Sequence, residues 1–128
     1  MEYDYLHQDL TSEIIRCFYN VYNKLGYGFL EKVYERSMII ELSKQGFFVE
    51  SQKPIEVFYN GEVVGEYFAD LVVDDSIIVE LKAAQSICEE HEIQLVNYLK
   101  ATNHEVGLLL NFGKKPEIGR KVLSNMNK

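Results

Sequence analysis

The sequence contains few cysteines and no long apolar segment. Its two cysteines, Cys17 and Cys88, lie far apart and form no CxxC pair, so the pattern does not indicate a zinc or iron–sulfur site built on thiolates. No stretch approaches the roughly 20 apolar residues that span a bilayer, and the opening "MEYDYLHQDL" lacks the basic start and apolar centre of a signal peptide. We therefore expect a cytoplasmic protein with no membrane partner.

Basic residues are also scarce, and they are unevenly distributed. The chain has 13 Lys and Arg against 20 Asp and Glu, and its net charge of -7 argues against a protein that coats nucleic acid, because phosphate contacts come largely from Lys and Arg. Residues 113–128, however, hold five of the basic residues and one of the acidic residues. Lys114, Lys115, Arg120 and Lys121 in this segment are candidates for phosphate contact, although a solvated helix face is the commoner reason for such a pattern.

The first part of the chain predicts two helices. With 128 residues, the chain has the length of one domain that can bury a core, so we take residues 1–128 as a single domain. Apolar residues recur at three- and four-residue steps in residues 9–25, which predicts an amphipathic helix with Asp9 as its N-cap. A second helix is expected from about residue 30 to residue 45, closed by Gly46.

The middle of the chain predicts an antiparallel meander. Four segments are rich in β-branched and aromatic residues, namely 47–52, 54–60, 66–73 and 76–83. Asn60-Gly61 is a strong hairpin signal between the second and third segments, and Asp74-Asp75 would turn the chain between the third and fourth. Nine aromatic residues are expected mostly in the core, with some of the tyrosines lining a groove, namely Tyr19, Tyr22, Tyr27, Tyr34, Phe47, Phe48, Phe58, Tyr59 and Phe68.

The last part of the chain predicts a crossover helix, a buried strand and a final helix. Ser86 and Glu89 fit a capping box that opens a helix to about residue 102. The almost wholly apolar residues 106–113 predict a strand parallel to 76–83, because a helix separates the two. Pro116 is expected to open a helix that ends near residue 125. The fold class is then α/β, a mixed sheet flanked by helices.

Three charged residues gather on one face of the predicted meander. Glu80 and Lys82 are two positions apart in "IIVELKAAQ", so their side chains share a face of an otherwise apolar strand. If the turn is centred at residue 75, Asp70 lies opposite Glu80, with Cβ atoms about 4.5–5.5 Å apart. Two carboxylates at that distance can hold one divalent cation. A structural pair of Glu80 with Lys82 is the alternative interpretation.

Three motifs resemble those of a known nuclease family. "FAD" at 68–70, followed after nine residues by "ELK" at 80–82, resembles the bipartite signature of the PD-(D/E)xK nuclease superfamily, with Ala69 in place of the usual proline. "GFLEKVY" at 28–34 resembles the Gly-x-x-Glu-x-x-Tyr pattern of the GxxExxY family, a small single-domain branch of that superfamily. Residues 91–113 look like the other characteristic block of this branch. The resemblance implies a restriction-endonuclease-like core.

The resemblance also implies a metal-dependent site that hydrolyses phosphodiesters. Asp70 and Glu80 would bind Mg²⁺ or Mn²⁺, assisted by the backbone carbonyl of Leu81. Lys82 would position or deprotonate the attacking water and offset the charge that grows on the phosphate. Glu31 matches the helical glutamate of the superfamily, which reaches the metal directly or through water. Capping of its own helix is the alternative role for Glu31.

Supporting residues are implied on the crossover helix. Gln94 and Tyr98 are spaced i, i+4, so they share a helix face and would orient Lys82 or a phosphate. His91 lies one turn before Gln94 on the same face. For Tyr98 and His91, packing within the fold is the alternative, and for His91 we favour it.

The implied function is hydrolysis of DNA, and two other functions stay open. A non-catalytic nucleic-acid-binding or protein-assembly module could keep the nuclease fold without turnover, because a fold does not fix a reaction. Hydrolysis of a smaller phosphodiester or a nucleotide would use the same residues. Because the body of the protein is acidic, a second copy of the chain or a partner subunit could supply more basic surface for DNA.

Overall fold

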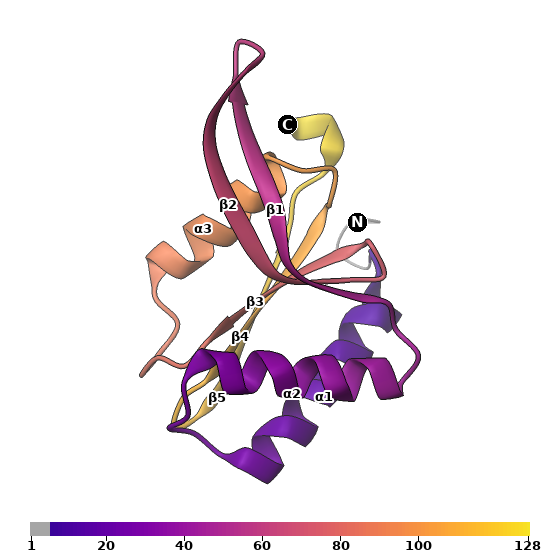
Figure 1. The fold of residues 1–128 in the computed structure, drawn as a ribbon, viewed down its shortest axis with the longest axis vertical. Helices are drawn as coiled ribbons and strands as arrows, with labels where there is room; N and C mark the ends of the chain where they lie inside the picture. Colours follow the sequence, from indigo (N-terminus) through magenta and orange to yellow (C-terminus); the bar gives the residue numbers. More distant parts are fainter. Residues whose placement is uncertain (1–5) are drawn as a thin grey trace.

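The computed structural model describes residues 6–128, in which helices cover both faces of one five-stranded sheet (Figure 1). Its elements are α1 Gln8–Leu25, α2 Glu31–Lys44, β1 Val49–Tyr59, β2 Glu62–Val73, β3 Ile77–Lys82, α3 Glu89–Lys100, β4 Val106–Phe112 and β5 Pro116–Val122. The strands lie in the order β1-β2-β3-β4-β5. Only β3 and β4 pair in parallel, and the other neighbouring strands are antiparallel. The predicted α/β class with a mixed sheet is confirmed.

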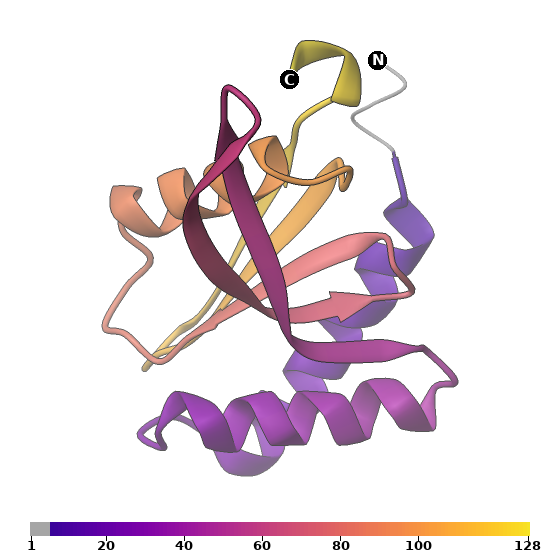
Figure 2. The same ribbon diagram turned by 45° about the horizontal axis from the view of Figure 1, so that its top comes forward.

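Each face of the sheet has its own apolar core. On one face α1 and α2 pack against the sheet, with Phe18, Tyr34 and Phe112 among the buried side chains. On the other face α3 packs against the sheet through Leu95 and Leu99. Figure 2 shows α2 and α3 on opposite sides of the strands. The sheet is therefore the middle layer, and β3 and the last part of β2, which carry Glu80 and Asp70, are covered from both sides.

The two predicted N-terminal helices are present with nearly the predicted bounds. The N-cap of α1 is His7, in a left-handed conformation with φ of 55°, and Asp9 lies inside the first turn, so the predicted cap was wrong. Gly46 follows α2 with a φ of 89°, a conformation that glycine adopts without strain. Within residues 6–128 no helix has the length and apolarity that crossing a bilayer requires.

The predicted meander of four strands has three. Segments 47–52 and 54–60 form the single strand β1, in which Gln52 has a left-handed φ of 51°. A left-handed residue is uncommon inside a strand, and the β1–β2 ribbon changes direction near its middle (Figure 2). Asn60 and Gly61 join β1 to β2 with φ values of 51° and 81°, as a two-residue hairpin turn requires.

The N-cap of the crossover helix lies two residues later than predicted. Cys88, not Ser86, is the N-cap of α3, and His91 replaces Glu89 as the residue that reaches back to the cap. The backbone N–H of Cys88 donates to His91 Nδ1 at 3.3 Å. The Ser-x-x-Glu pattern was misleading because the same geometry is available to a thiol and an imidazole two positions on.

The last predicted helix is a strand. β5 pairs antiparallel with β4, from Val106 opposite Val122 to Phe112 opposite Pro116. The outer edge of β4 needs hydrogen-bond partners, and Ile118 and Val122 pack on the core with the two-residue period of a strand. Proline is acceptable as the first residue of an edge strand, so Pro116 fits either structure. The helix interpretation relied on that proline and failed.

The aromatic residues are less buried than the sequence led us to expect. Tyr34 and Phe18 are fully buried, but many others are more than one-third exposed, namely Tyr19, Tyr27, Phe29, Phe48, Phe58, Tyr59, Tyr67 and Phe68. Four of these exposed residues, Phe58, Tyr59, Tyr67 and Phe68, lie on the β1–β2 hairpin. The hairpin therefore carries apolar surface that the folded chain does not cover.

Candidate active site

Asp70 and Glu80 meet where β2 and β3 diverge. The β2–β3 register pairs Leu71 with Val79, and its continuation places Asp70 opposite Glu80 as predicted. The backbone N–H of Asp70 donates to Glu80 Oε2 at 2.7 Å, and the N–H of Leu81 donates to Asp70 Oδ2 at 2.8 Å. Backbone donors thus fix one oxygen of each carboxylate.

Burial makes these two carboxylates resist ionisation. Glu80 is 4% exposed, and burial, followed by the negative charge of Asp70, raises the pKa of Glu80 to about 8. Burial also raises the pKa of Asp70, and the charge of Glu35 adds to this effect. A cation close to both groups would remove the mutual repulsion and offset the cost of burial.

The start of α2 adds two more carboxylates to the site. Glu31 is the first residue of α2, and its charge contributes to the raised pKa of Glu80. The N-cap of α2 is Leu30 and Glu31 is the first helical residue, not the third, so Glu31 does not form a capping box, although its charge in the first turn is favoured by the helix dipole. Glu35, one turn further on, is 6% exposed and lies 2.8 Å from Lys32 Nζ.

The sequence did not reveal Glu35 and Gln52. Gln52 Nε2 donates to Glu35 Oε1 at 2.5 Å and to Asp70 Oδ1 at 3.4 Å, so it joins α2 to the site. The i, i+4 spacing of Glu31 and Glu35 was a signal that could have identified Glu35, because it puts both residues on one helix face. Gln52 gave no signal, because its position depends on an irregular strand.

A small cavity beside Asp70 fits a hydrated cation. It has a volume of about 120 Å³ and is lined by Glu31, Lys32, Glu35, Gln52, Asp70 and Leu81. This volume exceeds the roughly 30 Å³ that one water occupies in the liquid. The acidic groups around it offer oxygen donors, which hard cations such as Mg²⁺ and Mn²⁺ prefer. Across residues 6–128 no three Asp, Glu, His or Cys side chains converge into a complete site, so a backbone carbonyl and water would supply further ligands.

Lys82 lies between the carboxylates and α3. Its Nζ donates to Gln94 Oε1 at 3.5 Å, and its positive charge offsets part of the rise that burial causes in the pKa values of Asp70 and Glu80. Tyr98, one turn after Gln94, is buried, and burial together with the charges of Glu80 and Asp70 raises its pKa to about 12. Tyr98 therefore keeps its proton at neutral pH and remains a hydrogen-bond donor.

His91 has a structural role at the start of α3. Its Nδ1 accepts from Cys88 N–H, which orders the first turn of the helix. The packing alternative fits His91 better than a role beside Gln94. For Tyr98 both interpretations hold, because its ring lies 5.7 Å from that of Tyr67 while its environment is shaped by the site carboxylates.

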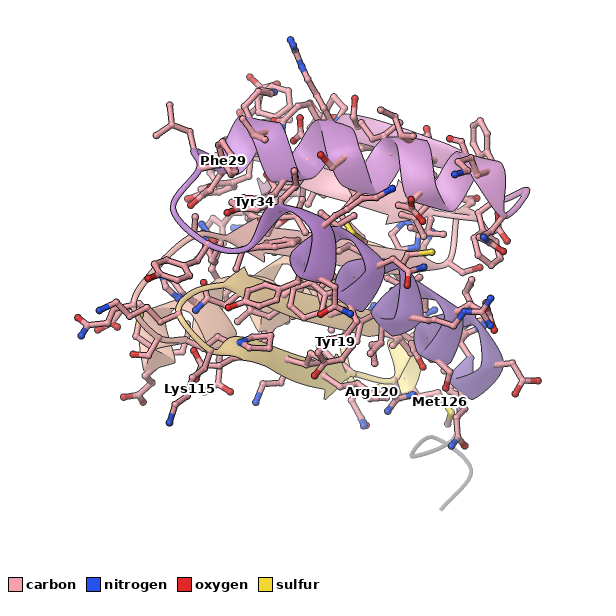
Figure 3. The ribbon with its side chains drawn as sticks, turned by 90° about the horizontal axis from the view of Figure 1, so that it is seen from below. Tyr19, Phe29, Tyr34, Lys115, Arg120 and Met126 are labelled. Atoms are coloured by element: carbon pink, nitrogen blue, oxygen red, sulfur yellow. The ribbon has the colours of Figure 1, made fainter. Side chains whose placement is uncertain are left out.

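Tyr34 fixes the turn that leads into Glu31. Its hydroxyl donates to the carbonyl of Gly26 at 2.8 Å and accepts from the N–H of Phe29 at 3.2 Å. Its ring stacks on Phe112 with centroids 4.1 Å apart, and Figure 3 shows Phe29 and Tyr34 together at the start of α2. The Gly-x-x-Glu-x-x-Tyr pattern thus combines a site carboxylate with the tyrosine that orders its turn.

Replacing Tyr34 by phenylalanine should destabilise the protein without removing a site group. The substitution keeps the ring but removes the hydroxyl from two partly buried hydrogen bonds, to the carbonyl of Gly26 and from the N–H of Phe29, at a cost of about 1 kcal/mol for each bond. Urea denaturation would measure the loss. Tyr27→Phe, at a 55% exposed tyrosine, is the matched control and should change stability little. Equal stability of the Tyr34 and Tyr27 variants would contradict this role.

Glu80 makes the stability of the metal-free protein depend on pH. Its folded pKa of about 8 lies above its ordinary value of 4.5, so between these pH values the folded protein holds a proton that the unfolded chain has released. The free energy of unfolding should therefore fall by up to about 1.4 kcal/mol for each pH unit in this window. The stability that protonated Glu80 contributes is fully present below pH 4.5 and is lost once the pH passes about 8.

Glu80→Gln should remove this pH dependence, because an amide keeps an acceptor for the N–H of Asp70 but does not titrate. Urea denaturation in EDTA at pH 5.5 and pH 9 would show the variant gaining stability relative to the native protein at the higher pH. Glu90→Gln, at an exposed position in the first turn of α3, is the control. Parallel pH profiles for the native and Glu80→Gln proteins would show that Glu80 titrates normally.

The basic C-terminal residues do not form one surface. Lys114 and Lys115 lie exposed on the turn between β4 and β5, near the end of the sheet that carries Lys82. Because β5 is a strand, Arg120 and Lys121 point to opposite faces. Arg120 Nη2 donates to the carbonyl of Leu6, and Lys121 lies 3.3 Å from a carboxylate oxygen of Glu92. Figure 3 shows Lys115 extending outward and Arg120 further along the strand.

Comparison with known proteins agrees with this geometry. The family model of the PD-(D/E)XK nuclease superfamily matches residues 8–121. The crystal structure of SSO0001 is similar in fold, with a TM-score of 0.50 and 18% identity, covering 88% of this chain and 66% of that chain. No curated protein matches the chain significantly. At this identity the structural likeness concerns the fold alone.

Proposed function

Because the chain belongs to the PD-(D/E)XK nuclease superfamily, we propose that it is a cytoplasmic, metal-dependent nuclease that hydrolyses phosphodiester bonds of DNA. The observation that carries the proposal is the meeting of Asp70, Glu80 and Lys82, in which a buried and a half-buried carboxylate repel each other beside an ammonium group. The residues "GFLEKVY" support membership in the GxxExxY branch, because Tyr34 orders the turn before Glu31.

Asp70, Glu80 and the backbone carbonyl of Leu81 would hold Mg²⁺ or Mn²⁺, and Glu31 would reach it directly or through water. Such an ion polarises the phosphate and lowers the pKa of a bound water. Asp70, Leu81 and Glu31 line the 120 Å³ cavity, which supports their part in this arrangement. Gln52 holds Asp70 from the other side and would limit its rotation.

The other site residues act on the phosphate and on the water. Lys82 would place its ammonium against the phosphate oxygens, where negative charge grows in the transition state. Gln94 accepts from Lys82 and would keep that side chain directed at the site. Tyr98 retains its proton and would donate to an oxygen of the substrate. Lys114 and Lys115 would contact the strand beyond the cleaved bond.

Incubation of the purified protein with DNA tests the proposal. At least one form of DNA, single-stranded or duplex, linear or circular, should be cleaved with Mg²⁺ or Mn²⁺ and left intact in EDTA, and Asp70→Ala/Glu80→Ala protein from the same purification should be inactive. RNA and small phosphodiesters belong in the same screen, because they would use the same residues. Metal binding without cleavage of any substrate would overturn the proposal and favour a non-catalytic nucleic-acid-binding or assembly module.

Gel filtration with light scattering would test the expected assembly. The exposed Lys114 and Lys115 offer little basic surface to DNA. A second copy or a partner subunit would extend it, so a dimer, or activity that appears only with a partner protein, agrees with this proposal.

A further inference from the structure

A wide groove lies between the β1–β2 hairpin and α3. Its volume is about 810 Å³, far larger than the cavity beside Asp70. Figures 1 and 2 show the hairpin rising beside α3. The apolar residues that line the groove are Val57, Phe58, Val64 and Tyr67 from the hairpin and Ile93 and Tyr98 from α3.

The groove leads into the candidate active site. Gln94 and Tyr98 belong to its wall, and Gln94 also contacts Lys82 at 3.5 Å. The charges of Asp70 and Glu80 act on Tyr98 from the other side. A ligand lying along the groove would therefore have one end at the groups proposed to cleave a phosphodiester.

The groove wall suits flat, uncharged rings and does not suit phosphates. Phe58 is 59% exposed, Tyr67 is 47% exposed and Ile93 is 51% exposed, so their apolar surfaces are available to a ligand. The charged residues of the wall are Glu56, Glu90 and Lys100, two negative and one positive. A phosphate backbone placed here would meet more repulsion than attraction, whereas a nucleobase offers a flat face to an aromatic ring.

Base pairing determines whether the flat faces of nucleobases are available to the aromatic residues of the groove. In a duplex the bases stack on one another, and their flat faces are hidden from protein side chains. An unpaired strand presents its bases freely, and aromatic side chains bind them with little dependence on sequence. The acidic chain, with its net charge of -7, also lacks the basic surface with which a protein neutralises both strands of a duplex.

We infer that the groove between the hairpin and α3 binds unpaired nucleobases, stacked on Tyr67 and Phe58, of the strand whose phosphate is cleaved at Lys82. The substrate class is therefore single-stranded nucleic acid, or a strand with an unpaired end. This inference rests on the proposed nuclease function, but the binding it describes is measurable without cleavage. Because Lys100 is the one basic residue of the groove wall within residues 6–128, few counterions are released on binding, so the affinity should fall less steeply with salt than is usual for proteins that bind single strands.

The test measures binding of the full chain in EDTA, which prevents cleavage. The probe is a single-stranded DNA oligonucleotide with 2-aminopurine, whose fluorescence changes when its base stacks on an aromatic ring. Native protein should bind it at least tenfold more tightly than the matched duplex. Tyr67→Ala should weaken binding about tenfold, and Tyr67→Phe should restore it, because stacking needs the ring and not the hydroxyl. Tyr27→Ala, at an exposed aromatic outside the groove, should bind normally.

Three results would overturn the inference. The first is equal affinity of the protein for single-stranded and duplex DNA, and the second is full affinity of folded Tyr67→Ala protein for the single strand. The third is a dimer of native protein in sedimentation that the Tyr67→Ala substitution dissociates, because the groove would then bind a second copy of the chain. An RNA oligonucleotide of the same sequence shows which polymer supplies the bases, and stacking of either supports the inference. If native protein stacks the bases but cleaves nothing in Mg²⁺, the nuclease function is refuted and the groove inference stands. If native protein cleaves DNA but the Tyr67→Ala substitution leaves binding unchanged, the groove inference is refuted and the nuclease function stands.

Discussion

Lys82→Ala protein should cleave DNA at least about a hundredfold more slowly than native protein while remaining folded, because removing one group that stabilises transition-state charge typically costs a factor of this size. Lys82 is half-buried at the end of β3, and its Nζ lies beside Gln94 and the carboxylate pair. The alanine variant removes the ammonium but leaves Asp70 and Glu80 in place. Its affinity for Mn²⁺ should stay the same or rise, since a positive charge has been removed from the site.

Single-turnover cleavage rates would measure this effect, and circular dichroism would show that the variant is folded. Lys44→Ala is the matched control, because it removes the same charge from the exposed last turn of α2. Cleavage by Lys82→Ala at the rate of the Lys44→Ala control would remove Lys82 from the mechanism.

Asp70→Asn should cost even more activity and yet stabilise the metal-free protein. The amide oxygen can still accept from the N–H of Leu81, so the local structure is kept. Because the substitution removes a negative charge that would bind the metal ion, the cleavage rate should fall about a thousandfold or more. In EDTA the variant should resist urea better than native protein, because burial raises the pKa of Asp70 and makes its charge costly.

Asp75→Asn is the control for Asp70→Asn, because Asp75 lies 72% exposed in the β2–β3 turn. It should keep its cleavage rate. Active Asp70→Asn protein, or lower stability of that variant in EDTA, would contradict the role given to Asp70. The opposite signs expected for activity and stability distinguish a functional charge from a structural one.

The carboxylate pair was predictable because a hairpin turn fixes the pairing of its strands. Asp74 and Asp75 both adopt left-handed φ values near 50°, which sets the turn and brings Asp70 opposite Glu80. Likewise the almost wholly apolar residues 106–113 predicted the buried strand β4 and its parallel pairing with β3. In both cases local chemistry determines long-range geometry.

The parts that sequence could not reveal depend on contacts between distant elements. Gln52 reaches Glu35 and Asp70 only because β1 is irregular at that residue, which no local pattern indicated. β5 is a strand because β4 offers it an edge, although Pro116 also suits a helix. Phe58 of the groove wall was expected in the core but is 59% exposed, since sequence shows how apolar a residue is but not whether another element covers it.

The central claim is that Asp70 and Glu80 together hold one divalent cation. Calorimetric titration of the purified protein with Mn²⁺ at pH 7, beside Asp70→Ala/Glu80→Ala protein at the same concentration, tests it directly. We predict about one ion bound per chain of native protein and loss of that binding in the double variant. Equal binding by both proteins, or binding by neither, would contradict the claim.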